Sequence, residues 1–309
     1  MLKYSVKKTG HYQGHRDSIF KLLKTNQEGS FLSASSDGMI VEWNTSKPDE
    51  GKLVAKHQGS VYSMCYHAEL DFIYSGENYS GIHLIDNKNH KELRSAKITD
   101  TGIFDIAFFG DYLLVATADG VLHVLDKLDL SVFSKFRISD NSLRSLFVNH
   151  QKKELIIGSS DGKIYVLSLD DFKLLHAFEA HSSSVFKVIC DPEFNYLYSV
   201  GRDARLKRWS LKDGFELQNE VIAHMFAIKD LVFNPTDSNQ FATSSMDKTI
   251  KVWEAEKVSL KKVIDKSRYQ SHGNSINSLL WLDDEQNTLV TAGDDKQIIT
   301  WKIERELAV

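Results

Sequence analysis

The chain contains few of the residues that cross-link secreted proteins or interrupt strands. Its 309 residues include only 2 cysteines and 3 prolines. A secreted fold of this size would more often carry several paired cysteines, whereas Cys65 and Cys190 lie far apart in the sequence. We therefore expect two buried free thiols in a cytoplasmic protein.

The chain also lacks a long apolar run and a large excess of charge of one sign. No window approaches the roughly 20 apolar residues that a bilayer span requires, and the first residues contain no apolar signal-peptide core. The 38 basic and 42 acidic side chains give a net charge of −4, without the broad basic surface that binding to nucleic-acid phosphates needs. We expect neither a membrane nor a nucleic acid as the partner.

What the chain does contain is a 12-residue pattern that returns along its whole length, first as SASSDGMIVEWN. Seven copies end at Trp43, Ile85, Leu125, Leu167, Trp209, Trp253 and Trp301. The spacing of 40 to 48 residues leaves room for four short strands in each unit, and Asp-Gly pairs mark turns between them. No segment has the periodicity of a helix.

Each unit also has an anchor residue 26 to 29 positions before its end, and this anchor is His in five units. Apolar residues follow the anchor at the fourth and seventh positions in all units. A strand alternates its faces every two residues, so a gap of three predicts a bulge whose two middle residues face away from the core. The fifth residues after the anchors are Phe20, Tyr62, Phe104, Arg144, Phe186, Lys229 and Asn277.

These units resemble the WD-repeat (WD40) family, in which each repeat of about 40 to 45 residues forms one blade of a propeller. The resemblance rests on the period, the anchor His, the turn Asp and the closing Trp, although the Trp-Asp pair itself never occurs. It implies an all-β, seven-bladed β-propeller of four-stranded antiparallel blades, as one domain over residues 1–309. Because 14 residues precede His15 and only 8 follow Trp301, we expect the N-terminal strand to close the last blade.

Four units carry His, Ser or Thr, Asp and Trp at a fixed spacing, which we call the tetrads. They are His15, Ser33, Asp37 and Trp43; His181, Ser199, Asp203 and Trp209; His224, Thr243, Asp247 and Trp253; His272, Thr291, Asp295 and Trp301. A Ser-His-Asp set suggests nucleophilic catalysis, but an enzyme needs one such site rather than four. The resemblance implies buried hydrogen-bonded chains instead. The other three units lack members of the set, so we expect packing alone to hold their blades.

No motif indicates a metal or a cofactor. His11 and His15 have the spacing of a zinc pair on a helix, but no helix or nearby cysteine is predicted there. The remaining histidines occur singly and are expected to be solvated or locally bonded, among them His67, His83, His90 and His123. The sequence contains neither a Gly-rich phosphate loop nor an EF-hand. We therefore expect no catalytic residue, no metal and no cofactor.

The family resemblance places the fifth residues at the rim of the central channel, on the face that carries the turn Asp residues. Four of these seven are aromatic although the core does not require it. With three residues that precede turn Asp positions, the expected partner-binding set is Phe20, Tyr62, Phe104, Arg144, Phe186, Arg202, Lys229, Met246, Asn277 and Asp294. The alternative is that the aromatic rings simply pack on neighbouring blades.

Aromatic side chains beside Arg and Lys are typical of interface hot spots, which favours a protein or peptide partner with apolar and acidic groups. We expect a non-catalytic interaction scaffold, a monomeric propeller within a complex. The alternative is a propeller enzyme, or a sugar- or small-ligand-binding protein, that uses Asp105, Asp230 and Asp294 at the channel mouth. The sixth residues should line the channel with mixed charge and water: Lys21, Ser63, Asp105, Ser145, Lys187, Asp230 and Ser278.

Overall fold

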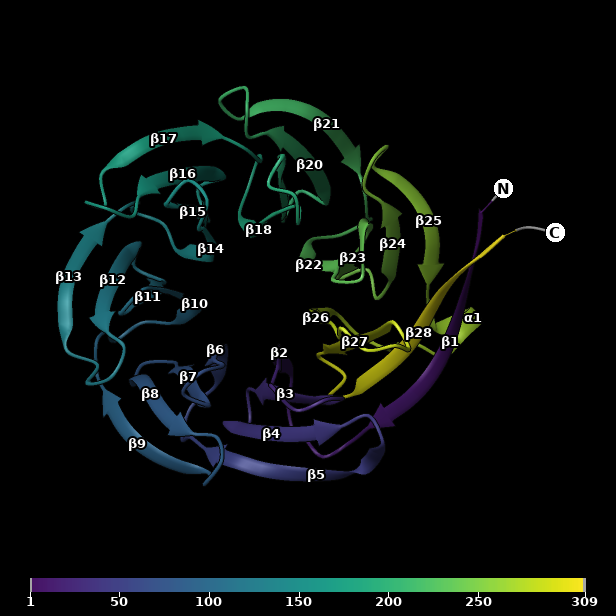
Figure 1. Ribbon diagram of the computed structural model, residues 1–309, viewed down its shortest axis with the longest axis horizontal. Coiled ribbons are helices and arrows are strands. Elements are labelled where there is room, and N and C mark those ends of the chain that lie inside the picture. The colour runs from purple at the N-terminus through teal and green to yellow at the C-terminus, as the bar shows by residue number, and fades with distance from the viewer. Residues whose placement is uncertain (1, 308–309) are drawn as a thin grey trace.

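The computed structural model describes residues 2–307, which form seven four-stranded antiparallel sheets arranged around a central axis (Figure 1). Each sheet is one blade, and its strands run in chain order from the channel to the outer edge, apart from the closing blade. The predicted seven-bladed propeller is confirmed.

The first four blades are continuous in sequence. Blade 1 contains β2 (Ile19–Lys24), β3 (Ser30–Ser35), β4 (Met39–Asn44) and β5 (Lys47–Lys56). Blade 2 contains β6 (Val61–His67), β7 (Phe72–Glu77), β8 (Gly81–Asp86) and β9 (Lys91–Ala96). Blade 3 contains β10 (Ile103–Phe109), β11 (Tyr112–Thr117), β12 (Val121–Asp126) and β13 (Val132–Arg137). Blade 4 contains β14 (Leu143–Asn149), β15 (Glu154–Ser159), β16 (Lys163–Ser168) and β17 (Leu174–Glu179).

The last three blades follow the same plan until the chain returns to its start. Blade 5 contains β18 (Val185–Cys190), β19 (Tyr196–Gly201), β20 (Arg205–Ser210) and β21 (Glu216–Ile222). Blade 6 contains β22 (Ile228–Asn234), β23 (Asp237–Ser245), β24 (Ile250–Glu254) and β25 (Ser259–Ile264). Blade 7 contains β26 (Ile276–Trp281), β27 (Thr288–Gly293), β28 (Ile298–Leu307) and β1 (Leu2–Tyr12).

The N-terminal strand closes the ring. β1 pairs antiparallel with β28, with Val6 opposite Ile303 and Lys8 opposite Trp301. In Figure 1 the purple β1 lies along the yellow β28 as the outer strand of blade 7. Tyr4 of β1 is buried in the core that also holds Trp301. The predicted closure is confirmed, and it joins the two ends of the chain in one sheet.

The core lies between the blades, because each sheet packs its faces against both neighbours. The second strands of the blades are almost wholly buried, and every residue of β3 and β27 is buried. The cluster around Trp301 joins residues of blades 6 and 7, and equivalent clusters join the other pairs. Cys65 and Cys190 are both free and buried, as expected from their isolation in the sequence.

One short helix was not expected. α1 (Lys266–Tyr269) lies between β25 and β26, and Asp265 caps its N-terminus by accepting a hydrogen bond from the backbone N–H of Arg268. The prediction of no helix was wrong here because four residues are too few to produce a helical periodicity. Within residues 2–307, no helix is long and apolar enough to cross a bilayer.

All seven innermost strands contain the predicted bulge. In β2, Ile19 lies opposite Ser35 and Lys21 opposite Ala34, so that Phe20 has no partner on β3. The same shift follows the first residue of the innermost strand in the other six blades. The bulge frees the side chain of the fifth residue from the alternation of the strand, which positions it at the channel mouth.

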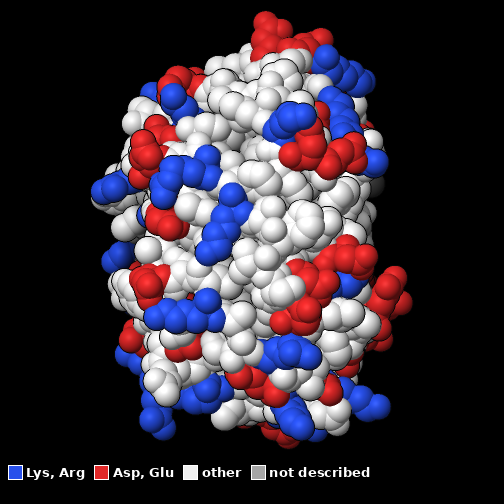
Figure 2. Space-filling model, turned by 90° about the vertical axis from the view of Figure 1, so that its left-hand side faces the viewer, with Lys and Arg blue, Asp and Glu red and all other residues white. Residues whose placement is uncertain are grey.

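The outer wall of the propeller carries charges of both signs. Figure 2 views the side formed by β9, β13 and β17, where Lys and Arg alternate with Asp and Glu around a band without charge. Exposed apolar side chains in this region include Val132 and Phe133 of β13 and Leu174 and Leu175 of β17. This side therefore shows no broad basic patch of the kind that nucleic-acid phosphates attract.

Candidate functional site

The members of all four tetrads come together as hydrogen-bonded chains. In blade 6, His224 Nδ1 lies 2.9 Å from Asp247 Oδ2, and His224 Nε2 lies 2.8 Å from Thr243 Oγ1. Trp253 Nε1 donates to the same hydroxyl oxygen at 2.9 Å. The sets of blades 1, 5 and 7 repeat these contacts with imidazole to carboxylate distances of 2.9 to 3.1 Å. Each hydroxyl is buried between an indole and an imidazole, which favours a structural role.

The charges of the blade 6 tetrad follow from its surroundings. Burial would raise the pKa of Asp247, but the hydrogen bonds from His224, Thr249 and Met225 outweigh it and lower that pKa. Burial lowers the pKa of His224, although Asp247 opposes this. At neutral pH the pair is therefore a carboxylate and a neutral imidazole, whose Nδ1–H donates to Asp247.

The expectation that packing alone holds blades 2, 3 and 4 was wrong. In blade 4, Ser139 Oγ donates to Asp161 at 2.6 Å, and the hydroxyl of Tyr165 donates to the same carboxylate at 2.8 Å. In blade 3, Thr117 Oγ1 donates to Asp119 at 2.6 Å. Ser139, Asp161 and Asp119 occupy the anchor and turn positions of their units, whereas Thr117 and Tyr165 come from positions outside the tetrad pattern, which the repeat does not reveal.

Blade 2 replaces its tetrad with a different polar group. The anchor His57 keeps its contact to the hydroxyl, with Nε2 3.0 Å from Ser75 Oγ. His83 lies between two carboxylates, with Nε2 3.0 Å from Glu77 Oε2 and Nδ1 2.9 Å from Glu92 Oε2. Burial lowers the pKa of His57 to about 4, with a further contribution from His83. His83 is locally bonded as expected, but it belongs to a cluster with His57 and two carboxylates.

The other histidines separate into different environments. His15 belongs to its tetrad, whereas His11 Nε2 lies 3.0 Å from Gln297 Oε1, so the suggested zinc pair has two unrelated sets of contacts. His123 is buried and neither of its ring nitrogens has a hydrogen-bond partner. The expectation of a solvated or locally bonded ring was wrong for His123, because the apolar core of blade 3 surrounds its strand.

A hollow of about 470 Å³ lies at the channel mouth, and all seven fifth residues line it. Three aromatic rings follow one another around it and two cations pack on rings: the rings of Phe20 and Tyr62 have centroids 4.3 Å apart, and the guanidinium of Arg144 lies 4.0 Å from the ring centroid of Phe104. Lys229 Nζ lies 4.7 Å from the ring centroid of Phe186. These side chains are half-buried, so they pack on one another and still face the hollow.

The electrostatics of the hollow favour an acidic group. Burial lowers the pKa of Lys229, and the nearby Arg144 lowers it further while Asp294 opposes both. Among the described residues that line the hollow there are two cations and no carboxylate. Two partly desolvated cations beside aromatic rings would be stabilised by an anion that enters the hollow.

Three of the ten predicted site residues do not line the hollow. Asp294 lies beside it and accepts a hydrogen bond from Asn277 at 2.7 Å, while Arg202 and Met246 are exposed. Sequence reasoning missed Tyr79, which lines the hollow and is 68% exposed. The available signal was that Tyr79 is an aromatic residue at the position where other units have the turn Asp. Sequence reasoning also missed Met225 and Phe226, which are exposed in the loop that follows His224.

Two of the predicted sixth residues, Asp105 and Asp230, join the innermost strands of neighbouring blades. Asp105 Oδ2 accepts the backbone N–H of Leu146 at 2.9 Å, and Asp230 Oδ2 accepts that of Leu279 at 2.9 Å. Asp105 also lies 3.4 Å from Lys21 Nζ. The two channel acids considered for a catalytic role thus hold the innermost strands in place.

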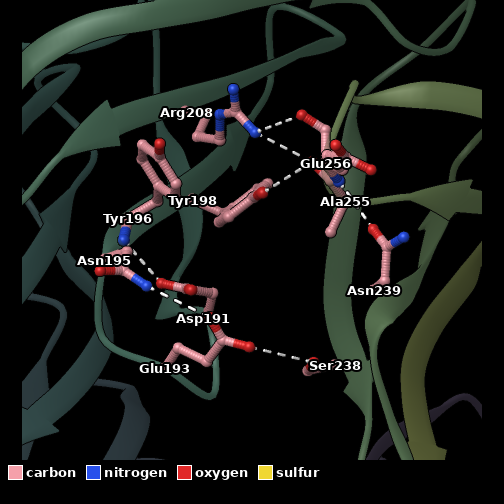
Figure 3. Close-up of a pocket in the computed structure, with 10 residues that line it drawn as sticks. All are labelled: Asp191, Glu193, Asn195, Tyr196, Tyr198, Arg208, Ser238, Asn239, Ala255 and Glu256. Carbon is pink, nitrogen blue, oxygen red and sulfur yellow. Dashed lines mark hydrogen bonds between the residues drawn. The ribbon is translucent and has the colours of Figure 1, made fainter.

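A second hollow, of about 300 Å³, lies between blades 5 and 6 (Figure 3). It is formed by the turns β18–β19 and β24–β25, at the ends of the strands opposite to the channel mouth. Arg208 Nη1 donates across it to the carbonyl oxygens of Ala255 and Glu256, at 2.9 and 3.1 Å, and the hydroxyl of Tyr198 donates to Ala255 O. These bonds stabilise the seam between the two blades.

The sequence model of WD40, described as WD domain, G-beta repeat, matches residues 6–44, 172–210, 215–254 and 265–302, which together make up half of the chain. This chain belongs to the WD40-repeat family. The four matched stretches are the four units with complete tetrads. The family's sequence model does not match the three units that lack a closing Trp. These units nevertheless fold as blades of the same kind.

The chain is similar to several longer proteins and to a solved propeller. Actin-interacting protein 1-2 of Arabidopsis thaliana is 24% identical over 307 residues, which cover 94% of this chain and 47% of that protein. Striatin-4 of Mus musculus is 30% identical over 135 residues, which cover 37% of this chain and 18% of that protein. The chain thus spans less than half the length of these curated relatives. The crystal structure of the WD40 β-propeller domain of Doa1 matches with a TM-score of 0.84 at 16% identity, covering 96% of this chain and 97% of that one.

Proposed function

We propose that this WD40 propeller is a non-catalytic scaffold that binds a protein or peptide at the hollow of the channel mouth. The observation that carries the proposal is that seven blades each contribute their bulged side chain to one hollow of about 470 Å³. Four of these side chains are aromatic, and two are cations placed over aromatic rings. Aromatic side chains and Arg are enriched in protein interfaces, and buried anchors of this kind carry much of the binding energy.

The proposed partner presents a carboxylate next to an apolar group. Arg144 and Lys229 both lie over the ring of Phe186, with distances of 5.8 and 4.7 Å to its centroid, so that one anion could approach both cations. The exposed Tyr79, Met225 and Phe226 provide further apolar area around the hollow. That several relatives are named actin-interacting proteins agrees with a protein partner in general.

The test is a pull-down with the wild-type chain, followed by binding titrations of the recovered protein against Phe104→Ala and Arg144→Glu. Removing a desolvated interface aromatic costs about 2 kcal/mol, which corresponds to roughly 30-fold in affinity. The matched control is Phe133→Ala, because Phe133 is 63% exposed on the outer strand β13, away from the hollow. The control should bind like the wild type.

Thermal melts of the same variants separate binding from folding. A rim substitution should change the free energy of unfolding by only about 0.5 kcal/mol. Unchanged affinity in both rim variants would place the interface elsewhere on the propeller. A large loss of melting temperature in Phe104→Ala, with no specific loss of affinity, would mean that these rings serve mainly to pack neighbouring blades.

A further inference from the structure

Blade 2 is the sheet β6–β9 in Figure 1. It brings two imidazoles and a carboxylate together, none of which lines the hollow of the channel mouth. His57 precedes β6, His83 lies in β8 and Glu92 lies in the outer strand β9. The ring centroids of the two histidines are 4.3 Å apart. One ring nitrogen of each histidine and one oxygen of Glu92 all lie within 4.8 Å of one another.

The second nitrogen of each ring is already held by a neighbouring group. Nε2 of His57 lies 3.0 Å from Ser75 Oγ, and Nε2 of His83 lies 3.0 Å from Glu77 Oε2. Histidines that bind metals usually have such a contact on the nitrogen that does not meet the ion, which orients the ring. Nδ1 is therefore the nitrogen that each ring can offer to an ion.

This arrangement exists because blade 2 departs from the tetrad. In the complete tetrads, a turn Asp lies 2.9 to 3.1 Å from Nδ1 of the anchor histidine. In blade 2 the corresponding residue is Tyr79, which is exposed. The carboxylate that faces Nδ1 of His57 belongs to Glu77 and is 3.9 Å away, too far for a hydrogen bond. Nδ1 of the buried His57 ring is thus left without a hydrogen bond to a turn Asp or to Glu77.

We propose that His57, His83 and Glu92 bind a divalent transition-metal ion of the Zn²⁺ class, with Ser75 and Glu77 orienting the two rings. Two imidazoles and one carboxylate suit Zn²⁺ and its neighbours in the first row, whereas Ca²⁺ and Mg²⁺ require oxygen ligands. Three protein ligands leave the fourth tetrahedral position to water.

The three ligand atoms must move closer together to hold an ion. With metal–ligand bonds of about 2.0 to 2.2 Å, the ligand atoms of a tetrahedral site lie roughly 3.3 Å apart. In the structure, the three candidate ligand atoms lie within 4.8 Å of one another. The side chain of Glu92 is 47% exposed on an outer strand, so it can rotate toward the two rings. The ion replaces the hydrogen bond between Glu92 and His83 Nδ1.

The experiment uses the full chain without a histidine tag, titrated with Zn²⁺ by calorimetry and with Co²⁺ by visible absorption. We expect one ion per chain, tetrahedral Co²⁺ bands, and a Zn²⁺-dependent rise in melting temperature. Glu92→Gln should weaken Zn²⁺ binding at least tenfold, and His83→Gln should abolish the Co²⁺ bands. The matched controls are Glu179→Gln, which changes another exposed outer-strand glutamate, and His150→Ala, which removes an exposed histidine.

Two results would overturn the proposal. One is the absence of Co²⁺ bands and of Zn²⁺ binding in the folded wild type; the other is Zn²⁺ binding that Glu92→Gln and the controls leave equally strong. The cluster would then be only a hydrogen-bonded substitute for the tetrad. If His83→Gln fails to fold, Glu92→Gln decides the question, because its exposed side chain can change without disturbing the core. The outcome is independent of the channel-mouth proposal, since no variant alters a residue that lines that hollow.

Discussion

Replacing Asp247 with Ala tests whether a tetrad stabilises its blade. The carboxylate accepts hydrogen bonds from His224 Nδ1 at 2.9 Å, from the backbone N–H of Met225 and Thr249 at 3.0 Å each, and from Thr249 Oγ1 at 2.7 Å. The two backbone groups lie near the surface and can bind water after the substitution. Nδ1 of His224 is buried, so it loses its main partner.

The size of the effect follows from that one buried donor. A buried donor without a partner costs about 1 to 3 kcal/mol. Thr249 Oγ1 lies 3.2 Å from the same nitrogen and can accept its hydrogen bond, which keeps the cost from exceeding this range. For a chain of this size, the expected fall in melting temperature is roughly 2 to 5 °C.

The matched control is Asp119→Ala, at the corresponding turn of blade 3. Asp119 accepts one side-chain hydrogen bond, from Thr117 Oγ1, and that hydroxyl also lies 2.6 Å from Val121 O, to which it can donate instead. Its loss should therefore cost less than about 1 kcal/mol. The assay is chemical and thermal unfolding of both variants, followed by circular dichroism. Equal losses for Asp247→Ala and Asp119→Ala would refute the reasoning, because the tetrad would then contribute nothing beyond an ordinary turn aspartate.

Deleting residues 1–9 should lower the melting temperature strongly, since β28 loses its partner strand and the Tyr4 side chain leaves the core; a melt within a degree or two of the full chain would contradict the closure argument. A fluorophosphonate probe should not label Ser199 in the folded protein, because its hydroxyl is buried between His181 and Trp209; labelling detected by mass spectrometry would overturn the structural role of the tetrads. Stability should fall as the pH is lowered. The pKa of His224 in the folded protein lies below its unfolded value of about 6.5, so the contribution of His224 to stability is complete above that pH and decreases as the pH falls below it. The lowered pKa of Asp247 causes a further loss of stability below about pH 4. Urea unfolding measured from pH 8 to pH 3 checks this, and a stability that is constant or rises toward acid pH would contradict it.

Much of the fold could be predicted because the same local pattern occurs seven times. Strand alternation makes the three-residue gap between Ile19 and Leu22 a bulge, and this conclusion needs no knowledge of neighbouring blades. The counts of residues before His15 and after Trp301 were enough to predict that β1 pairs with β28. The tetrads are visible for the same reason, since their four members recur at one spacing.

Only the tertiary structure decided which side chains of different strands meet. The contact of Arg144 with the ring of Phe104 joins two blades, and its distance depends on the rotation between them, which no single repeat encodes. The meeting of His83 and Glu92 depends on the bulge that shifts β8 against β9, at a place where the tetrad pattern is absent. The pattern of the repeat therefore determined the backbone and the rim positions. The hollow and the blade 2 cluster arose from packing between strands and blades, because those contacts depend on register and on side-chain shape.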